Sequence, residues 1–414
     1  MVENYDFDEI LDRTQLSTMK WEAEIDRLND PGLLCLGTAE MDFRSATPIV
    51  KALEDVVRSG YFGYPYKRDS YYAAIIGYFE RHFNWAIKQE WIASHVGIYP
   101  SMQPLIEELT EPGDEIVYQT PVHFVFKEVI EKAGRRAVPN PLTCHAEHYE
   151  IDFDNLEKTI TPRTRMLLFC SPHNPVGRVW SRQELSRLHG IVVRHNLLVV
   201  SDEVYSGMIH GGHQHIPIAS ISREVAFKTV TLVSTSKSFN TTGLKHSLVI
   251  AENPDLLAAY RSGLGRSNLH FGSSIFGEAA TEAAFRDCDH WTVQLMHYIR
   301  ANFLFLREFI AEHMPMVCVT EPEAGYFAWL NFSNLISQPS DLKHFFERNA
   351  RVVVTPGDLM GPGGENHVRI NLGCPRTILE QALKRIAACC VILAEKNDGG
   401  VLFEASQVSP RENI

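Results

Sequence analysis

Short apolar runs alternate with helical patterns between about residue 70 and residue 251. The runs at 114–121, 165–170, 197–203 and 230–233 are predicted to be strands, and helical periodicity lies between them at 124–132 and 182–195. Continuous apolar strands separated by helices are typical of a parallel sheet that is covered on both faces. The alternation therefore predicts an α/β fold with a mostly parallel sheet flanked by helices.

The pattern changes after residue 274. The chain is predicted to be helical to about residue 313, then β-rich from 317 to 371 with one helix near 341–348, and helical again from 376 to 396. A length of 414 residues favours two domains. We expect an N-terminal segment (1–49) that joins a smaller α+β domain (291–396), a large ligand-binding domain (50–290) and a loose tail (397–414).

Composition argues against several classes of protein. The net charge of -12 opposes non-specific binding to nucleic acid or to anionic lipid. No apolar run approaches the roughly 18 residues of a membrane span, and no export signal is recognised, so a cytoplasmic protein is expected. The eight cysteines contain no Cys-x-x-Cys and are predicted to be free thiols. His210, His213 and His215 lack carboxylates or thiols at metal spacing, so no metal site is predicted.

Three unlike polar side chains each stand just past the end of a predicted strand: Asn174, Asp202 and Lys237. Ligands of parallel sheets bind at the carboxyl ends of the strands, so these side chains are expected to converge on one crevice. Lys237 is predicted to lie in a tight loop between two strands, where partial burial would lower its pKa and free its amine for covalent chemistry. The helix that opens near residue 99 begins with small and polar residues, which suits a phosphate group.

Five motifs together resemble those of the fold-type-I pyridoxal-phosphate enzymes of the aminotransferase superfamily. They are SPHNPVGR (171–178), SDE (201–203), GHQHIPIAS (212–220), SKSFN (236–240) and RINLGCPR (369–376). Within the superfamily the chain is most similar to the cystathionine β-lyase and cystalysin-type carbon–sulfur lyases, from about residue 20 to about residue 391. The resemblance implies the aminotransferase fold type I, pyridoxal 5'-phosphate as cofactor, an amino acid as substrate, and a homodimer with shared active sites.

The resemblance also implies a role for each matching residue. Lys237 would hold the cofactor covalently and later move the Cα proton, and Asp202 would keep the pyridine nitrogen protonated. Arg369 would bind the substrate α-carboxylate through a bidentate fork. The other implied contacts are Asn174 and Tyr205 at the ring oxygen, Ser234, Ser236, Ser101 and Met102 at the phosphate, Tyr64 at the phosphate of the neighbouring subunit, His123 at the ring face, and Gly37 and Ala39 at the substrate.

Three positions depart from the lyase pattern, and a fourth departs from the pattern of many aminotransferases. His123 stands where the lyases have an aromatic residue, usually Tyr, and Gly37 replaces a bulky wall residue. Tyr205, in Asp-Glu-Val-Tyr, is closer to aminotransferases, many of which carry Arg where Lys245 stands. A wider pocket with an ionisable ring suggests a bulkier substrate or altered chemistry.

The predicted function is that of a carbon–sulfur β-lyase, which cleaves an S-substituted cysteine to a thiol, pyruvate and ammonia. Two alternatives keep the cofactor: transamination, and decarboxylation with oxidative deamination of a sulfur-containing conjugate, as in relatives that act in antibiotic biosynthesis. A third alternative, a non-enzymatic protein that binds a transcription regulator, has little support because the catalytic set is intact.

Overall fold

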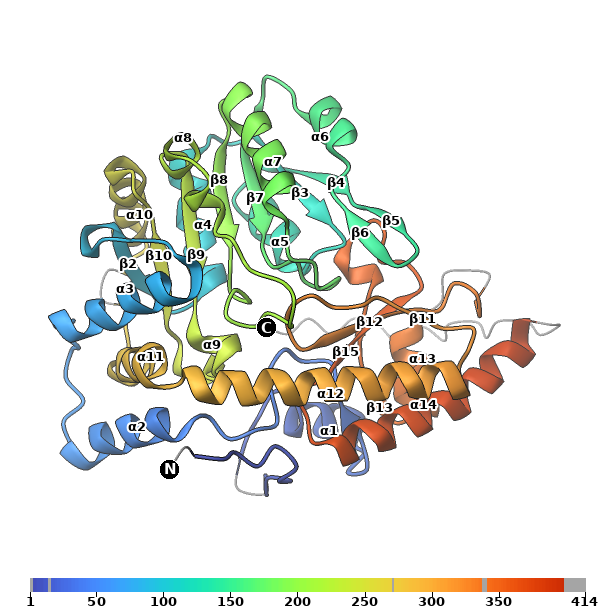
Figure 1. Ribbon diagram of the computed structural model, residues 1–414. Coiled ribbons are helices and arrows are strands. Elements are labelled where there is room, and N and C mark those ends of the chain that lie inside the picture. Colours follow the sequence, from blue (N-terminus) through green and yellow to red (C-terminus); the bar gives the residue numbers. More distant parts are fainter. Residues whose placement is uncertain (1–2, 14–15, 270–271, 337–340, 398–414) are drawn as a thin grey trace.

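The computed structural model describes residues 3–13, 16–269, 272–336 and 341–397. Its large sheet has seven strands in the order β2-β10-β9-β8-β7-β3-β4 (Figure 1). Strands β4, β3, β7, β8 and β9 pair in parallel, whereas β10 is antiparallel to both β9 and β2. The prediction of a mostly parallel sheet is therefore confirmed. The bounds are β2 Ile92–His95, β3 Glu115–Thr120, β4 Arg136–Pro141, β7 Thr164–Cys170, β8 Leu198–Asp202, β9 Thr229–Val233 and β10 Ser247–Ile250.

Helices cover both faces of this sheet, and strand β7 shows how the faces divide. Met166 and Leu168 belong to the cluster that contains residues of α4 and α5, while Leu167 and Phe169 belong to the cluster that contains residues of α7. Alternate residues of a strand point to opposite faces, so a strand that is buried on both faces must be apolar throughout. The helices here are α4 Ile98–Leu109, α5 Val125–Lys132, α6 Phe153–Thr159, α7 Arg182–Arg194, α8 Arg223–Ala226 and α10 Pro254–Arg266.

A second, antiparallel sheet has the order β11-β12-β15-β14. The long helix α12 packs on α14, and both lie near this sheet (Figure 1). Strand β1 pairs in parallel with β13, which ties the N-terminal segment to this part of the chain. The bounds are β1 Leu34–Cys35, β11 Cys318–Val319, β12 Phe327–Asn331, β13 Val352–Val353, β14 Thr355–Pro356, β15 His367–Asn371, α12 Asp289–His313, α13 Leu342–Asn349 and α14 Arg376–Asn397.

The remaining α-helices and strands are α1 Glu22–Leu28, α2 Thr47–Ser59, α3 Asp69–Phe83, α9 Thr235–Ser238, α11 Ile275–Asp287 and the hairpin β5 Thr143–His145 with β6 His148–Glu150. The strand expected near 351–355 is split into β13 and β14. The domain boundaries stay a prediction, and from residue 398 onward the predicted tail lies outside the described residues. Within the described part of the chain, no helix has both the length and the apolar character needed to cross a membrane.

Candidate active site

A cavity of about 840 Å³ lies at the carboxyl ends of the parallel strands and reaches the loop that precedes α2. Strands β7 and β8 and the segment after β9 supply its polar groups from the large sheet, and β15 supplies Arg369 from the small sheet. Ten of the residues predicted from the sequence line this cavity: Gly37, Ala39, His123, Asn174, Asp202, Tyr205, Ser234, Ser236, Lys237 and Arg369. The convergence that strand polarity predicted is therefore present.

Lys237 lies in the one-turn helix α9, whereas the sequence predicted a tight loop between two strands. The hydroxyl of Ser234, the residue between β9 and α9, accepts from the Ser236 backbone N–H at 3.1 Å and so begins the turn. The Lys237 amine donates to the Ala39 carbonyl oxygen at 2.7 Å. Burial, followed by the positive charge of Arg369, lowers the pKa of Lys237 to about 8. A useful fraction of its amine is thus neutral near physiological pH.

Asp202 ends strand β8 and is buried. One carboxylate oxygen accepts from the Val204 backbone N–H at 3.1 Å. Burial raises the pKa of Asp202 to about 7, against the opposing effects of that hydrogen bond and of Lys237. A buried carboxylate of this kind is best stabilised by a cation or by a protonated ring nitrogen that enters the cavity.

Arg369 is buried at the middle of β15, opposite Thr355 of β14. It donates to the Asn174 side-chain oxygen at 3.0 Å, to the Gly37 carbonyl oxygen at 3.1 Å and to the Thr355 hydroxyl at 3.2 Å. Its guanidinium carbon lies 4.0 Å from the centre of the Phe327 ring. The Arg369 Nε is buried and has no hydrogen-bond partner among the described residues. This donor is available to a carboxylate ligand.

His123 stacks with Tyr99, the ring centres being 5.5 Å apart, and its Nδ1 lies 3.1 Å from the Tyr99 hydroxyl. Burial lowers the pKa of His123 to about 3, and the positive charges of Arg369 and Lys237 act in the same direction. The sequence predicted an ionisable ring at this position. In the structure the imidazole is neutral across the physiological range, so its effect comes from shape and hydrogen bonding.

The first turn of α4, and not its second, borders the cavity. Gly97 and Tyr99 line the cavity. The predicted phosphate contacts, Ser101 and Met102, are buried and are not among the residues that line it. The Ser101 N–H already donates to the Gly97 carbonyl oxygen at 3.2 Å. Only the first N–H groups of a helix lack such partners and can bind an anion. Gly97, directly before the apolar helix, was the signal in the sequence that marks this turn.

Two further predicted positions behave differently. Tyr64 is 86% exposed and is not among the residues that line the cavity, so a role at a phosphate requires a partner chain. At Gly37, an added Cβ would lie 3.2 Å from the Val354 carbonyl carbon. A side chain at this position would press on the segment between β13 and β14. The glycine therefore allows its loop to pack closely against that segment, in addition to leaving room in the pocket.

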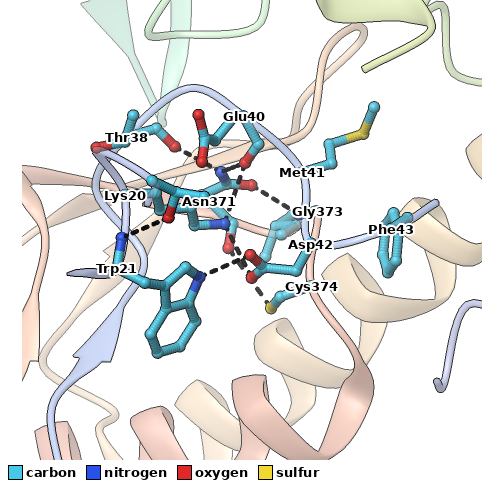
Figure 2. Close-up of polar contacts among 12 residues, drawn as sticks. Lys20, Trp21, Thr38, Glu40, Met41, Asp42, Phe43, Asn371, Gly373 and Cys374 are labelled. Atoms are coloured by element: carbon cyan, nitrogen blue, oxygen red, sulfur yellow. Dashed lines mark hydrogen bonds and ion pairs between the residues drawn. The ribbon is translucent and has the colours of Figure 1, made fainter. Parts of the chain in front are cut away.

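The loop that carries the substrate-side residues is held by a buried polar network (Figure 2). The Lys20 amine donates to the Asp42 carboxylate at 2.9 Å and to the Glu40 carbonyl oxygen at 3.0 Å. The Trp21 indole N–H donates to the other Asp42 oxygen at 2.7 Å. The Asn371 side chain donates to the carbonyl oxygens of Thr38 and Glu40 at 2.7 and 2.6 Å. This network fixes the backbone of residues 38–42 against β15.

Residues 32–386 match the family model of class I and II aminotransferases. The chain belongs to this family. It is 33% identical to the cystathionine β-lyase PatB of Bacillus subtilis over 383 residues, which cover 92% of this chain and 99% of PatB. The fold is similar to cystalysin of Treponema denticola, with a TM-score of 0.90 and 28% identity over 94% of this chain and 100% of cystalysin. It is also similar to a carbon–sulfur lyase of Staphylococcus hominis, with a TM-score of 0.88 and 30% identity over 94% and 99% of the two chains.

Members of this family depend on pyridoxal phosphate, and both solved relatives contain it. The residues that line the cavity of this family member have the functional groups that the cofactor requires. The cavity offers a half-buried, partly neutral amine at Lys237, a buried carboxylate at Asp202 and a helix N-terminus at Gly97, and Lys245 lines the same cavity. The sequence does not identify Lys245 as a candidate phosphate contact, because a lysine in a loop carries no distinctive signal.

The histidine-rich segment has a structural role in this family member. The His215 Nε2 lies 2.8 Å from a Glu203 carboxylate oxygen, and the His210 Nε2 lies 3.0 Å from the Gly325 carbonyl oxygen. Among the described residues, no three or more His, Cys, Asp or Glu side chains are grouped so that they could hold a metal ion.

Proposed function

We propose that this chain is a pyridoxal-phosphate-dependent carbon–sulfur β-lyase, which converts an S-substituted cysteine and water into a thiol, pyruvate and ammonia. One observation carries the proposal: Lys237, Asp202 and Arg369 line a single cavity. The similarity to PatB and to the two solved lyases supports elimination at Cβ over the other outcomes of this family.

Each residue has a definite task in this reaction. Lys237 would hold the cofactor, Asp202 would pair with its ring nitrogen, Asn174 and Tyr205 would contact the ring oxygen, and the first turn of α4 with Ser234, Ser236 and Lys245 would hold its phosphate. When bound, the cofactor supplies an electron sink that makes the substrate Cα acidic. Arg369 binds and orients the substrate carboxylate, and the Lys237 Nζ accepts the Cα proton. The Ala39 carbonyl, 2.7 Å from that nitrogen, holds it in position.

The assembly and the location of the protein complete the proposal. A homodimer would bring the exposed Tyr64 of one subunit to the phosphate bound in the other. The aromatic side chains beside it in the chain, Tyr61, Phe62 and Tyr66, are also more than half exposed, which supports a protein contact at this segment. The proposal also includes a cytoplasmic location and a small amino acid as substrate.

A second candidate function is transamination or decarboxylative oxidative deamination of a similar substrate. The observation that favours it is the hydrogen-bonded pair of His123 and Tyr99 at the ring face. This pair could direct a proton or a substrate carboxylate differently from a lone aromatic ring.

One incubation separates the candidates. The cofactor-loaded protein is mixed with cystathionine and, separately, with a bulky S-alkyl cysteine, and thiol, pyruvate, ammonia and carbon dioxide are measured together. Equal amounts of thiol, pyruvate and ammonia are the expected result. Carbon dioxide or an aldehyde without free thiol would overturn the lyase assignment in favour of the second candidate.

A further inference from the structure

The charged groups of the cavity are not all needed by the cofactor and the α-carboxylate. Asp202, Lys237, Lys245 and Arg369 have tasks in the proposed function. Three charged residues that line the cavity remain: Glu24, Glu40 and Lys343. A charge that faces a partly dehydrated cavity is costly unless a partner group satisfies it. These three side chains therefore bear on which substituent the cavity accepts.

Two of the three already have partners of opposite charge. Glu24 lies 2.5 Å from the Arg27 guanidinium, and Lys343 lies 3.8 Å from the Glu347 carboxylate. Glu40 differs from both. Among the hydrogen bonds and ion pairs of the described residues, none involves the Glu40 carboxylate.

The backbone of Glu40 is held firmly although its carboxylate is not. Its carbonyl oxygen accepts from Lys20 and Asn371, and its N–H donates to the Thr38 carbonyl oxygen at 3.0 Å (Figure 2). Binding groups are effective when the structure, and not the ligand, fixes their position. Burial raises the pKa of Glu40, and the negative charge of Asp42 acts in the same direction. The positive charges of Lys20 and Lys237 lower this pKa. An incoming cation would stabilise the charged form of this carboxylate.

We propose that Glu40 is a specificity-determining residue, whose carboxylate binds a cationic group at the end of the substituent on the substrate sulfur. The inference rests on the proposed function and names its substrate class: S-conjugates of cysteine that end in an ammonium or similar cation. Arg369 binds the α-carboxylate and Glu40 binds the far end, so the two charges set the orientation of the conjugate across the cavity.

The test uses two conjugates of equal length, S-(2-aminoethyl)cysteine, which ends in an ammonium, and S-propylcysteine, which ends in a methyl group. The cofactor-loaded enzyme should show a higher kcat/KM for the aminoethyl conjugate. Glu40→Gln should reduce that value by about tenfold to a hundredfold, mainly through KM, because one charge-assisted contact is lost. The value for S-propylcysteine should change by less than threefold. Glu24→Gln, which alters a carboxylate that is already paired, is the matched control and should preserve the preference.

Two outcomes would overturn the inference. An equal loss on both conjugates in Glu40→Gln would mean that Glu40 acts on Lys237 or on the loop and not on the substituent. The absence of any preference in the unmodified enzyme would mean that the carboxylate does not contact this group. Thermal unfolding of both variants within about 2–3 °C of the unmodified protein verifies that folding is intact.

A binding measurement separates failure of this inference from failure of the proposed function. L-lysine and 2-aminoheptanoic acid match the two conjugates in length but have no sulfur to eliminate. Calorimetric titration should give a lower Kd for L-lysine, and Glu40→Gln should remove the difference. If no conjugate releases thiol, the lyase proposal fails, and the lysine titration still decides the role of Glu40. Equal Kd values for the two ligands in the unmodified enzyme would overturn that role.

Discussion

The side-chain amine of Lys237 donates a hydrogen bond to the carbonyl oxygen of Ala39, 2.7 Å away and 198 residues earlier in the chain. Lys237 follows a strand of the large sheet, whereas Ala39 belongs to a loop that Asn371 holds against the small sheet. The reactive nitrogen is thus positioned by both parts of the molecule. The Tyr326 hydroxyl donates to the same carbonyl oxygen at 3.0 Å, which fixes its direction.

Replacing Lys237 by Ala should abolish covalent attachment of pyridoxal phosphate, because the side chain supplies the amine of the linkage. The measurement is the mass of the protein after reduction with borohydride, which should increase by one reduced cofactor in the unmodified enzyme only. Lys245→Ala is the control and should retain the adduct with weaker binding. An adduct that persists in Lys237→Ala would place the linkage elsewhere.

Replacing Arg369 by Lys should raise KM for the amino acid substrate by about tenfold to a hundredfold, while cofactor binding changes little. A lysine cannot reproduce the planar fork that contacts both ligand oxygens. Steady-state kinetics, together with the absorbance of the bound cofactor, provides the measurement. Loss of the cofactor in this variant would show that Arg369 holds the cofactor instead of the substrate.

The rate of cofactor attachment to the cofactor-free protein should rise with pH around a midpoint of about 8. Only the neutral amine reacts, and burial lowers the pKa of Lys237 to about 8 from its ordinary 10.5. The neutral fraction therefore increases as pH rises through that value, from about one-tenth at pH 7. Stopped-flow absorbance gives the rate. A rate that keeps increasing tenfold per pH unit up to pH 10 would contradict the lowered pKa.

Replacing His123 by Tyr tests the second candidate function. If the pair of His123 and Tyr99 directs the reaction away from simple elimination, the variant should yield more pyruvate per carbon dioxide or aldehyde formed. His123→Phe is the matched variant, because it keeps a ring and removes the hydrogen bond to Tyr99. An unchanged product ratio in both variants would leave His123 with a packing role only.

Replacing Lys20 by Met should destabilise the protein by about 3 kcal/mol, because it removes the buried ion-pair partner of Asp42, 2.9 Å away, and leaves only the more exposed Arg13 at 3.9 Å. Chemical denaturation of the cofactor-free protein measures the free energy of unfolding. The double variant Lys20→Met with Asp42→Asn should recover part of the loss, since no uncompensated charge then remains. A single variant as stable as the unmodified protein would show that this buried pair does not hold the loop.

Much of the fold could be predicted from local patterns. The apolar runs that became β7, β8 and β9 had the composition of strands buried on both faces, and helices α5 and α7 begin within one residue of the prediction. The sequence predicted phosphate contacts at Ser101 and Met102, whereas the start of α4 that borders the cavity is at Gly97–Tyr99, about one turn earlier. A motif locates a helix within a few residues, whereas anion binding depends on which N–H groups lack an acceptor.

The sequence alone determined the parallel sheet and the edge at which Asn174, Asp202 and Lys237 meet, because strand polarity places the ends of parallel strands together. Only the tertiary structure decided what faces them: the Ala39 carbonyl beside Lys237, and Glu40, which lines the same cavity. These contacts depend on how a loop near residue 40 packs against β15, more than three hundred residues later. Such long-range packing results from the burial of Lys20, Asp42 and Asn371 together, and no local pattern encodes it.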